Sequence, residues 1–308
     1  MALPTSTTLV TFPSGSTHGG STVVAAVPLP GGVLGVVTDT TPFHPLDHSW
    51  PDQPGDRGTV EFDTVEFAGA RYPVVDCLTG AVGPMGEFAL GDEIPARRGD
   101  AQWTWLAVHL VETADGTGVS AAAGITPESL VGRAVVLRVD TERRAALCAA
   151  HTGCHLLALA LNEALAGRWH KEPARADALG SPDFDALAMA SSRMDEHAST
   201  DRYRIGKSLR KKGFDPDGLA ASLPELTSRV NERLAGWIAA DARVRVHAPG
   251  AELTARRRWV CELPEGTASI DCGGTHLSRL GELSSLTTSL SLSGDGAELV
   301  AVTVPKRA

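Results

Sequence analysis

Cysteine is scarce in this sequence, and the cysteines that are present do not form a disulfide pattern. There are five, an odd number at irregular spacing, at positions Cys77, Cys148, Cys154, Cys261 and Cys272. The N-terminal residues, which begin Met1-Ala-Leu-Pro-Thr, lack a basic segment followed by an apolar run. We therefore expect neither a disulfide scaffold nor secretion, and we predict a cytoplasmic protein.

Uninterrupted hydrophobic runs of membrane-spanning length are missing as well. The longest apolar stretches, such as 23–29 and 33–37, are separated by Pro30, Gly31 and Gly32. They are far shorter than the roughly 20 residues that a transmembrane helix needs. No membrane partner is expected.

The sequence also lacks an excess of positive charge. The formal net charge is −9, so the chain as a whole does not attract a polyanion. Binding to nucleic acid would need local basic patches, and the sequence has two, at Arg202, Arg204, Lys207, Arg210, Lys211 and Lys212 and at Arg256, Arg257 and Arg258. These residues either contact RNA or are solvated basic loops on an acidic protein.

A phosphate-binding loop is not predicted. Gly206-Lys-Ser208 is similar to the end of such a loop, but Asp201 stands where the first glycine is required, and no apolar strand precedes it. We therefore predict no nucleotide cofactor.

The composition is that of a folded protein with room for two domains. The chain has 308 residues, of which 43% are hydrophobic and 21% charged. Up to about residue 120, short runs rich in β-branched residues alternate with turn residues, which is typical of an antiparallel β-barrel. The runs are 21–29, 33–38, 58–67 and 103–111.

The composition of the sequence changes at about residue 120. The change is marked by Gly-Thr-Gly at 116–118 and by Pro127. The stretch 142–165 is rich in Ala, Leu and Arg and predicts a long helix. A second helix is predicted at 224–241, where apolar residues recur at helical spacing. Strands are predicted at 243–246, 258–263 and 299–304, so the second half is mixed α+β.

The strongest local signal is His151-Thr-Gly-Cys-His155 inside the first predicted helix. Residues four apart lie on one face of a helix, so both imidazoles can reach one metal ion. Alone, such a pair is equally compatible with two satisfied or surface histidines.

A second signal, Cys272-Gly-Gly-Thr-His276, lies far downstream. A thiolate and an imidazole four positions apart can converge on one ion, because the two glycines permit a tight turn between them. Together the two pairs supply three nitrogens and one sulfur, a ligand set that suits Zn²⁺ rather than Mg²⁺ or Ca²⁺.

These motifs resemble elements of a known family. His151-Thr-Gly-Cys-His155-Leu-Leu resembles the HxxxH-Leu-Leu element of the alanyl-tRNA synthetase editing domain, and Cys272-Gly-Gly-Thr-His276-Leu resembles its CGGTH element. Val139-Asp-Thr-Glu-Arg-Arg144 resembles the lead-in to the first histidine, and Asn231 matches the helix before the second motif. Pro42-Phe-His-Pro45 followed by Gln53-Pro-Gly-Asp-Arg-Gly58 is similar to the barrel-domain signature of the synthetase and of its freestanding AlaX relatives. The resemblance runs in order from about residue 36 to about residue 285.

The resemblance implies a zinc enzyme that acts in trans on aminoacyl-tRNA. Its reaction would be hydrolysis of the ester of mischarged aminoacyl-tRNA, typically Ser- or Gly-tRNA(Ala). It also implies an α+β protein with a translation-factor-like antiparallel β-barrel domain at 1–125 and a zinc-dependent editing domain at 126–308. Four protein ligands would close the zinc site, so either zinc accepts a fifth ligand or one histidine, His276 or His155, yields its place.

The resemblance assigns roles to individual residues. The zinc ligands and catalytic residues are His151, His155, Cys272 and His276, with Thr275 as a further catalytic residue. Substrate contacts are expected from Gly273, Gly274, His44, His48 and Gln53, although a tight turn alone also explains the glycines, and the two histidines can equally lie at the surface. Contacts with the RNA backbone are expected from Lys207, Arg210, Lys211 and Lys212.

Two departures from the family pattern affect these expectations. A glycine-rich GGGQ run is usual between the two barrel signatures, whereas this chain has Leu46-Asp-His-Ser-Trp-Pro-Asp52, in which Trp50 either shapes a pocket or packs. Cys154 stands where a small residue without sulfur is usual, and we predict that it packs rather than binds metal. The altered loop leaves open that the same fold acts on another aminoacyl-tRNA or aminoacyl ester. A closed four-ligand zinc site leaves open a non-enzymatic, zinc-stabilised tRNA-binding module. The sequence does not predict the oligomeric state.

Overall fold

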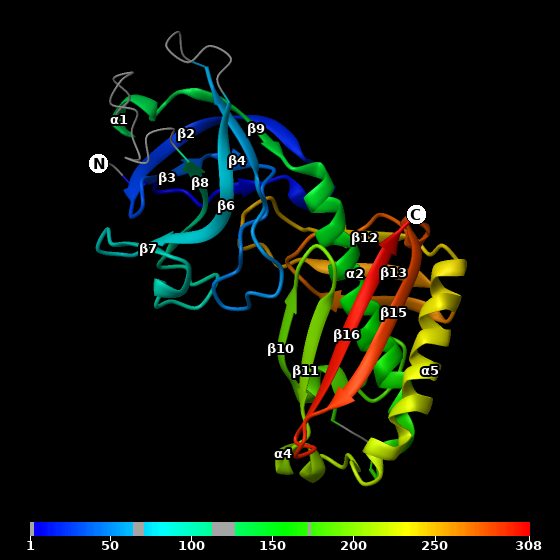
Figure 1. The fold of residues 1–308 in the computed structure, drawn as a ribbon. Coiled ribbons are helices and arrows are strands. Elements are labelled where there is room, and N and C mark those ends of the chain that lie inside the picture. The colour runs from blue at the N-terminus through cyan, green and yellow to red at the C-terminus, as the bar shows by residue number, and fades with distance from the viewer. Residues whose placement is uncertain (1–2, 64–70, 113–126, 172–173) are drawn as a thin grey trace. The chain divides into compact units, whose positions relative to one another are not determined.

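The computed structural model describes residues 3–63, 71–112, 127–171 and 174–308, and it shows a mixed α+β protein (Figure 1). The chain forms two compact units. The first unit comprises Met1–Arg144 and Ala248–Arg257, and the second unit comprises Ala145–His247 and Arg258–Ala308. The predicted domain boundary at 125/126 falls outside the described residues, and the division between the units follows Arg144 instead.

The first unit is built on a seven-stranded sheet in which the described pairings are antiparallel. Its strand order is β5 (Gly58–Phe62), β9 (Ala134–Val139), β2 (His18–Leu29), β3 (Val33–Thr38), β8 (Thr104–Glu112), β6 (Arg71–Val82) and β7 (Phe88–Leu90). A further pairing of β5 with β6 joins six of these strands into a ring. The four predicted strands are confirmed, except that the predicted residues 64–67 lie outside the described part of the chain.

The unit extends beyond residue 125 because β9 belongs to its sheet. β9 pairs with both β2 and β5, and its alternating residues Val135, Leu137 and Val139 enter the apolar core. The unit also contains the short elements β1 (Leu9–Val10), β4 (Thr40–Thr41) and α1 (Pro127–Leu130), with 3₁₀ turns at Phe12–Ser14 and Gly91–Glu93.

A buried ion pair joins two segments of the first unit that are far apart in sequence. The guanidinium of Arg144 makes a bidentate contact with the carboxylate of Asp56, and it also donates to the carbonyl oxygen of Pro42 at 2.9 Å. The backbone N–H of His44 donates to the same carboxylate. The side chains of Asp56 and Arg144 are 1% and 5% exposed, so water does not solvate them. Each charge is balanced by the other.

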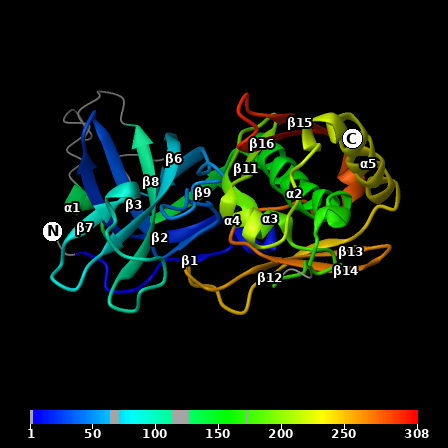
Figure 2. The same cartoon turned by 90° about the horizontal axis from the view of Figure 1, so that it is seen from below.

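The second unit places one long helix between two antiparallel sheets (Figure 2). The helix is α2 (Thr141–Ala164), within one residue of the predicted 142–165 at each end. The four-stranded sheet has the order β10 (Met189–Met194), β11 (Ser199–Arg204), β16 (Glu298–Arg307) and β15 (Leu283–Leu292). The three-stranded sheet has the order β12 (Val244–His247), β13 (Arg258–Leu263) and β14 (Gly266–Asp271).

The glycine in α2 is explained by close packing on the larger sheet. A Cβ atom at Gly153 would lie 2.9 Å from the side chain of Leu286 on β15 and 3.6 Å from that of Thr303 on β16. Glycine costs a helix about 1 kcal/mol relative to alanine, but here it lets the helix approach the strands.

Length and composition alone would allow α2 to cross a membrane, yet 89% of its apolar stretch is buried within the protein. It is the core helix of the second unit, since Leu156, Leu157 and Leu161 belong to that unit's main apolar cluster. Its sequence contains no uninterrupted apolar run of membrane-spanning length, because histidine, threonine and asparagine are spaced among its apolar residues.

The second helix, α5 (Leu219–Ala239), begins five residues before the predicted start at Pro224. Pro224 lies inside its second turn, where one backbone hydrogen bond is lost. The first helical residue, Leu219, is buried in the main apolar cluster of the unit. The side-chain amide of Asn231 pairs with the backbone of Thr288 on β15: it donates to the carbonyl oxygen at 2.9 Å and accepts from the N–H at 2.7 Å. The remaining helical segments are α3 (Phe184–Ala188) and α4 (Lys207–Lys211), with 3₁₀ turns at Ala166–Arg168 and Leu280–Glu282.

Candidate metal centre

The helix α2 supplies two of the four predicted ligands. His151 and His155 lie on the same face of the helix, one turn apart, with ring centroids 4.9 Å from each other. Both side chains are buried, with exposed fractions of 1% and 9%. The helix backbone therefore fixes the position of both imidazoles.

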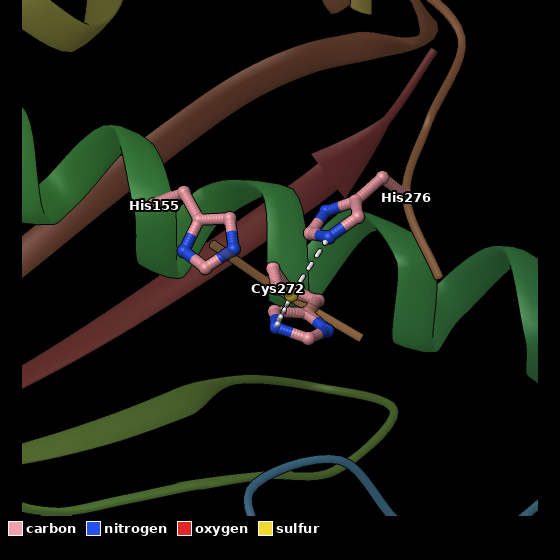
Figure 3. A group of neighbouring side chains, drawn as sticks. His155, Cys272 and His276 are labelled. Atoms are coloured by element: carbon pink, nitrogen blue, oxygen red, sulfur yellow. Dashed lines mark hydrogen bonds between the residues drawn. The ribbon is translucent and has the colours of Figure 1, made fainter. Parts of the chain in front are cut away.

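The loop that follows β14 supplies the other two. The Sγ atom of Cys272 lies 3.3 Å from Nε2 of His151. It also lies 3.3 Å from Nε2 of His276, and a dashed line in Figure 3 marks this contact. One donor atom from each of His151, His155, Cys272 and His276 lies within 4.8 Å of the others. The structure thus brings together the four predicted ligands from two segments more than a hundred residues apart in sequence.

The protonation of this cluster favours binding of a cation. Burial lowers the pKa of His151 to about 3, and burial together with the neighbouring His151 lowers the pKa of His155 well below its usual value. Both imidazoles are therefore neutral near pH 7, which is the form that binds metal. The backbone N–H of Gly274 donates to Sγ of Cys272 at 3.4 Å.

The residues present fit a metal ion. Nε2 of His155 is buried and has no hydrogen-bond partner among the residues that the structure describes. An unpaired buried nitrogen costs about 1–3 kcal/mol, and coordination would remove that cost. Three imidazoles and a thiolate are the donors that transition-metal ions prefer, so this cluster can hold such an ion.

Other side chains surround the cluster, and the sequence analysis did not identify them. The indole ring of Trp259 on β13 packs against the ring of His155 with centroids 5.2 Å apart. The hydroxyl of Thr152 lies 3.4 Å from Nδ1 of His276 and accepts the N–H of Leu277 at 3.1 Å. The thiol of Cys148 donates to the hydroxyl of Thr275 at 3.2 Å. Only their positions in the sequence could have indicated these residues. Thr152 directly follows the ligand His151, and Cys148 lies about one helical turn before His151.

Cys154 is turned toward a different group of side chains. Its thiol donates to the buried carboxylate of Asp201 at 3.4 Å and lies 3.6 Å from the hydroxyl of Ser192. It does not belong to the described group of potential metal ligands. These contacts place the Cys154 thiol against Asp201 and Ser192, and that it packs rather than binds metal remains a prediction.

The predicted substrate contacts in the loop after β14 lie beside the cluster. Thr275 is 3% exposed and Gly274 is buried, whereas Gly273 is half-buried. Because the hydroxyl of Thr275 and the amide of Gly274 already have partners within the protein, they shape the ligand loop. Their contact with a substrate remains a prediction.

The other predicted substrate contacts belong to the first unit and are buried within it. The ring of His48 stacks on that of Trp105 at 5.3 Å, and its Nε2 lies 3.1 Å from the carbonyl oxygen of Ala96. Gln53 is fully buried and His44 is 6% exposed. The side chain of His48 is 5% exposed although its residue as a whole is half-buried, so neither histidine ring lies at the surface of this unit.

The altered loop at 46–52 is anchored by Asp47. This carboxylate accepts the backbone N–H groups of Ser49 and Trp50 and forms an ion pair with Arg98. Burial opposes ionisation of Asp47, but Arg98 and these hydrogen bonds outweigh it and lower its pKa. Trp50 is 43% exposed, so packing does not account for it within the first unit.

The predicted RNA contacts are solvent-exposed in the second unit. Lys207, Arg210 and Lys211 lie on α4, and Lys212 follows directly. Arg210 forms an ion pair with Asp217 at 3.1 Å. The second basic run differs, because Arg257 is 3% exposed and donates to the backbone carbonyl oxygens of Glu252 and Leu253 in the first unit.

No protein-family model matches the chain, and none of the curated proteins matches it significantly.

Proposed function

We propose that this protein is a zinc-dependent hydrolase that removes the amino acid from mischarged aminoacyl-tRNA in trans, as a freestanding member of the alanyl-tRNA editing family. The observation that carries the proposal is the convergence of His151, His155, Cys272 and His276 into one group of donors. The residues of both motifs that carry the family resemblance are the ones that meet there. The ring of antiparallel strands supports the corresponding view of the first unit as the β-barrel domain of the family.

Zinc is the metal we propose, because three imidazoles and a thiolate form one of its common ligand sets. When bound, zinc would supply a Lewis acid for the ester carbonyl and lower the pKa of a bound water toward about 7. The protein's own residues hold this centre in place: α2 fixes His151 and His155, and the loop after β14 presents Cys272 and His276.

His276 is the ligand that we expect to yield to a substrate. Four protein donors complete a tetrahedral site, whereas hydrolysis needs a further position. His276 is half-buried and lies on a loop, whereas His151 and His155 are buried and held by a helix. The loop can therefore move at a lower cost than the helix.

A panel of charged tRNAs tests the proposed activity. The zinc-loaded protein is incubated with Ser-, Gly- and Ala-tRNA(Ala) and with other aminoacyl-tRNAs, and loss of the amino acid is followed over time. We expect fastest hydrolysis of Ser- or Gly-tRNA(Ala) and slow hydrolysis of the correct Ala-tRNA(Ala). Fast hydrolysis of a different aminoacyl-tRNA would redirect the proposal to that substrate, as the altered 46–52 loop permits.

One observation favours a second, non-enzymatic candidate. The cluster already offers four protein donors, which is the pattern of structural zinc sites. In that case zinc would stabilise a tRNA-binding protein. Zinc-loaded protein that binds tRNA but cleaves none of the panel would favour this function.

The exposed basic residues near α4 are the proposed RNA contacts. Reversal of Lys211 and Lys212 to glutamate is expected to weaken tRNA binding and to reduce the steepness of its salt dependence by about 0.9 for each lost phosphate contact. Binding is measured by fluorescence anisotropy over a salt series. The matched control reverses Arg97 and Arg229, which are also exposed and change the net charge equally. If both double variants bind alike, the cluster near α4 is merely solvated.

A further inference from the structure

Thr152 links the helix and the loop that together form the cluster. It follows His151 on α2 and is fully buried. Its Oγ1 atom accepts the backbone N–H of Leu277 at 3.1 Å and lies 3.4 Å from Nδ1 of His276. One hydroxyl therefore contacts both the ring of a ligand and the backbone of the residue that follows it.

This contact distinguishes the two nitrogens of His276. Nε2 faces the Sγ atom of Cys272 at 3.3 Å, and Nδ1 faces Thr152. A neutral imidazole carries its proton on one nitrogen and a lone pair on the other. The hydrogen bond made by the protonated nitrogen decides which nitrogen offers its lone pair.

The loop ligands need such a tether more than the helix ligands do. The backbone of α2 fixes His151 and His155, but Cys272 and His276 lie on a loop and are half-buried. The ring of His276 packs against those of His151 and His155 at 4.4 and 5.0 Å, and the attachment to α2 adds a directional restriction to this packing. A preorganised ring lowers the cost of ordering it on binding.

We propose that Thr152 is a positioning residue for the metal centre. Its hydroxyl accepts the Nδ1–H of His276 and so leaves the lone pair of Nε2 directed into the cluster. The hydrogen bond from the backbone N–H of Leu277 attaches the loop to α2 at Thr152. This inference rests on the proposed metal centre. It goes beyond that proposal by giving an orienting role to a residue that is not itself a metal ligand.

Replacement of Thr152 by valine tests the inference, because valine keeps the shape and removes the hydroxyl. Zinc affinity is measured by competition with a chelating dye, and we expect it to fall about 10–100-fold, as for other residues that orient metal ligands. Thr152→Ser keeps the hydroxyl and should retain most of the affinity. The matched control is Thr303→Val, which removes another buried hydroxyl of the second unit that is paired with Thr288 at 2.9 Å. It should leave zinc affinity unchanged.

A double-mutant cycle separates positioning from general destabilisation. In the His276→Ala background the ring is absent, so Thr152→Val should cause little further loss of zinc affinity. An equal loss in both backgrounds would overturn the inference and leave the metal centre intact. Unchanged zinc affinity in Thr152→Val would also overturn the inference and leave the metal centre intact, even if the variant is less stable. Wild-type protein that binds no zinc would overturn the proposed function together with the inference.

Discussion

Replacement of Cys272 by alanine is expected to lower zinc affinity by more than about 100-fold, because it removes a side chain that binds the metal directly rather than one that orients a ligand. The variant would keep the three imidazoles but lose the one anionic donor of the cluster. Hydrolysis of aminoacyl-tRNA should fall to background at the same time. Zinc content is measured by elemental analysis of protein purified without added metal, with about one equivalent expected in the wild type.

Cys261→Ala is the matched control for this experiment. Cys261 is fully buried on β13 in the same unit, and it lies outside the group of potential ligands. Its loss should reduce stability but leave zinc content near one equivalent. If Cys272→Ala retained full zinc content, or if the wild type contained less than about half an equivalent of any transition metal, the metal centre would be refuted.

The second large effect is expected in the first unit, at the buried pair of Asp56 and Arg144. Asp56→Asn has nearly the same shape but leaves the guanidinium of Arg144 buried without its counter-charge. Loss of one partner of such a pair typically costs about 3–5 kcal/mol. Urea unfolding followed by tryptophan fluorescence measures this loss.

Two comparisons test the cause of that destabilisation. The exposed pair of Glu61 and Arg71 belongs to the same unit, with side chains 30% and 61% exposed, so Glu61→Ala should cost less than about 1 kcal/mol. The double variant Asp56→Asn/Arg144→Met removes both charges and should recover part of the stability lost in Asp56→Asn. Equal costs for Asp56→Asn and Glu61→Ala would show that the burial of the first pair contributes nothing.

The sequence predicted those elements whose residues follow a regular period. α2 was placed to within one residue because its apolar residues are numerous and no proline interrupts them. β10 and β11 were missed because runs such as Met189-Ala-Ser-Ser-Arg-Met194 are polar, and their pairing with β16 determines their conformation. Similarly, β9 was not predicted because only its partners β2 and β5, distant in sequence, assign it to the first unit.

The candidate site was predictable at the level of its ligands and not of its supports. Four residues in two short motifs carry recognisable donor chemistry, so spacing and residue type sufficed. Thr152 and Cys148 carry no such pattern, because threonine and cysteine in an apolar helix usually only pack. Their roles depend on contacts with His276 and Thr275, more than a hundred residues away, which a reading along the chain does not reveal.

The pairing of Asn231 with Thr288 also affects how β15 can pair with another chain. β15 lies at one end of the four-stranded sheet, where an exposed strand would offer open backbone groups to any other extended chain. The carboxamide of Asn231 has the same donor and acceptor as a peptide group, and it occupies the position that a fifth strand would take at Thr288. An incoming chain would have to displace two formed hydrogen bonds near the middle of the strand. A single side chain on α5 thus hinders edge-to-edge aggregation of a strand that is rich in serine and threonine.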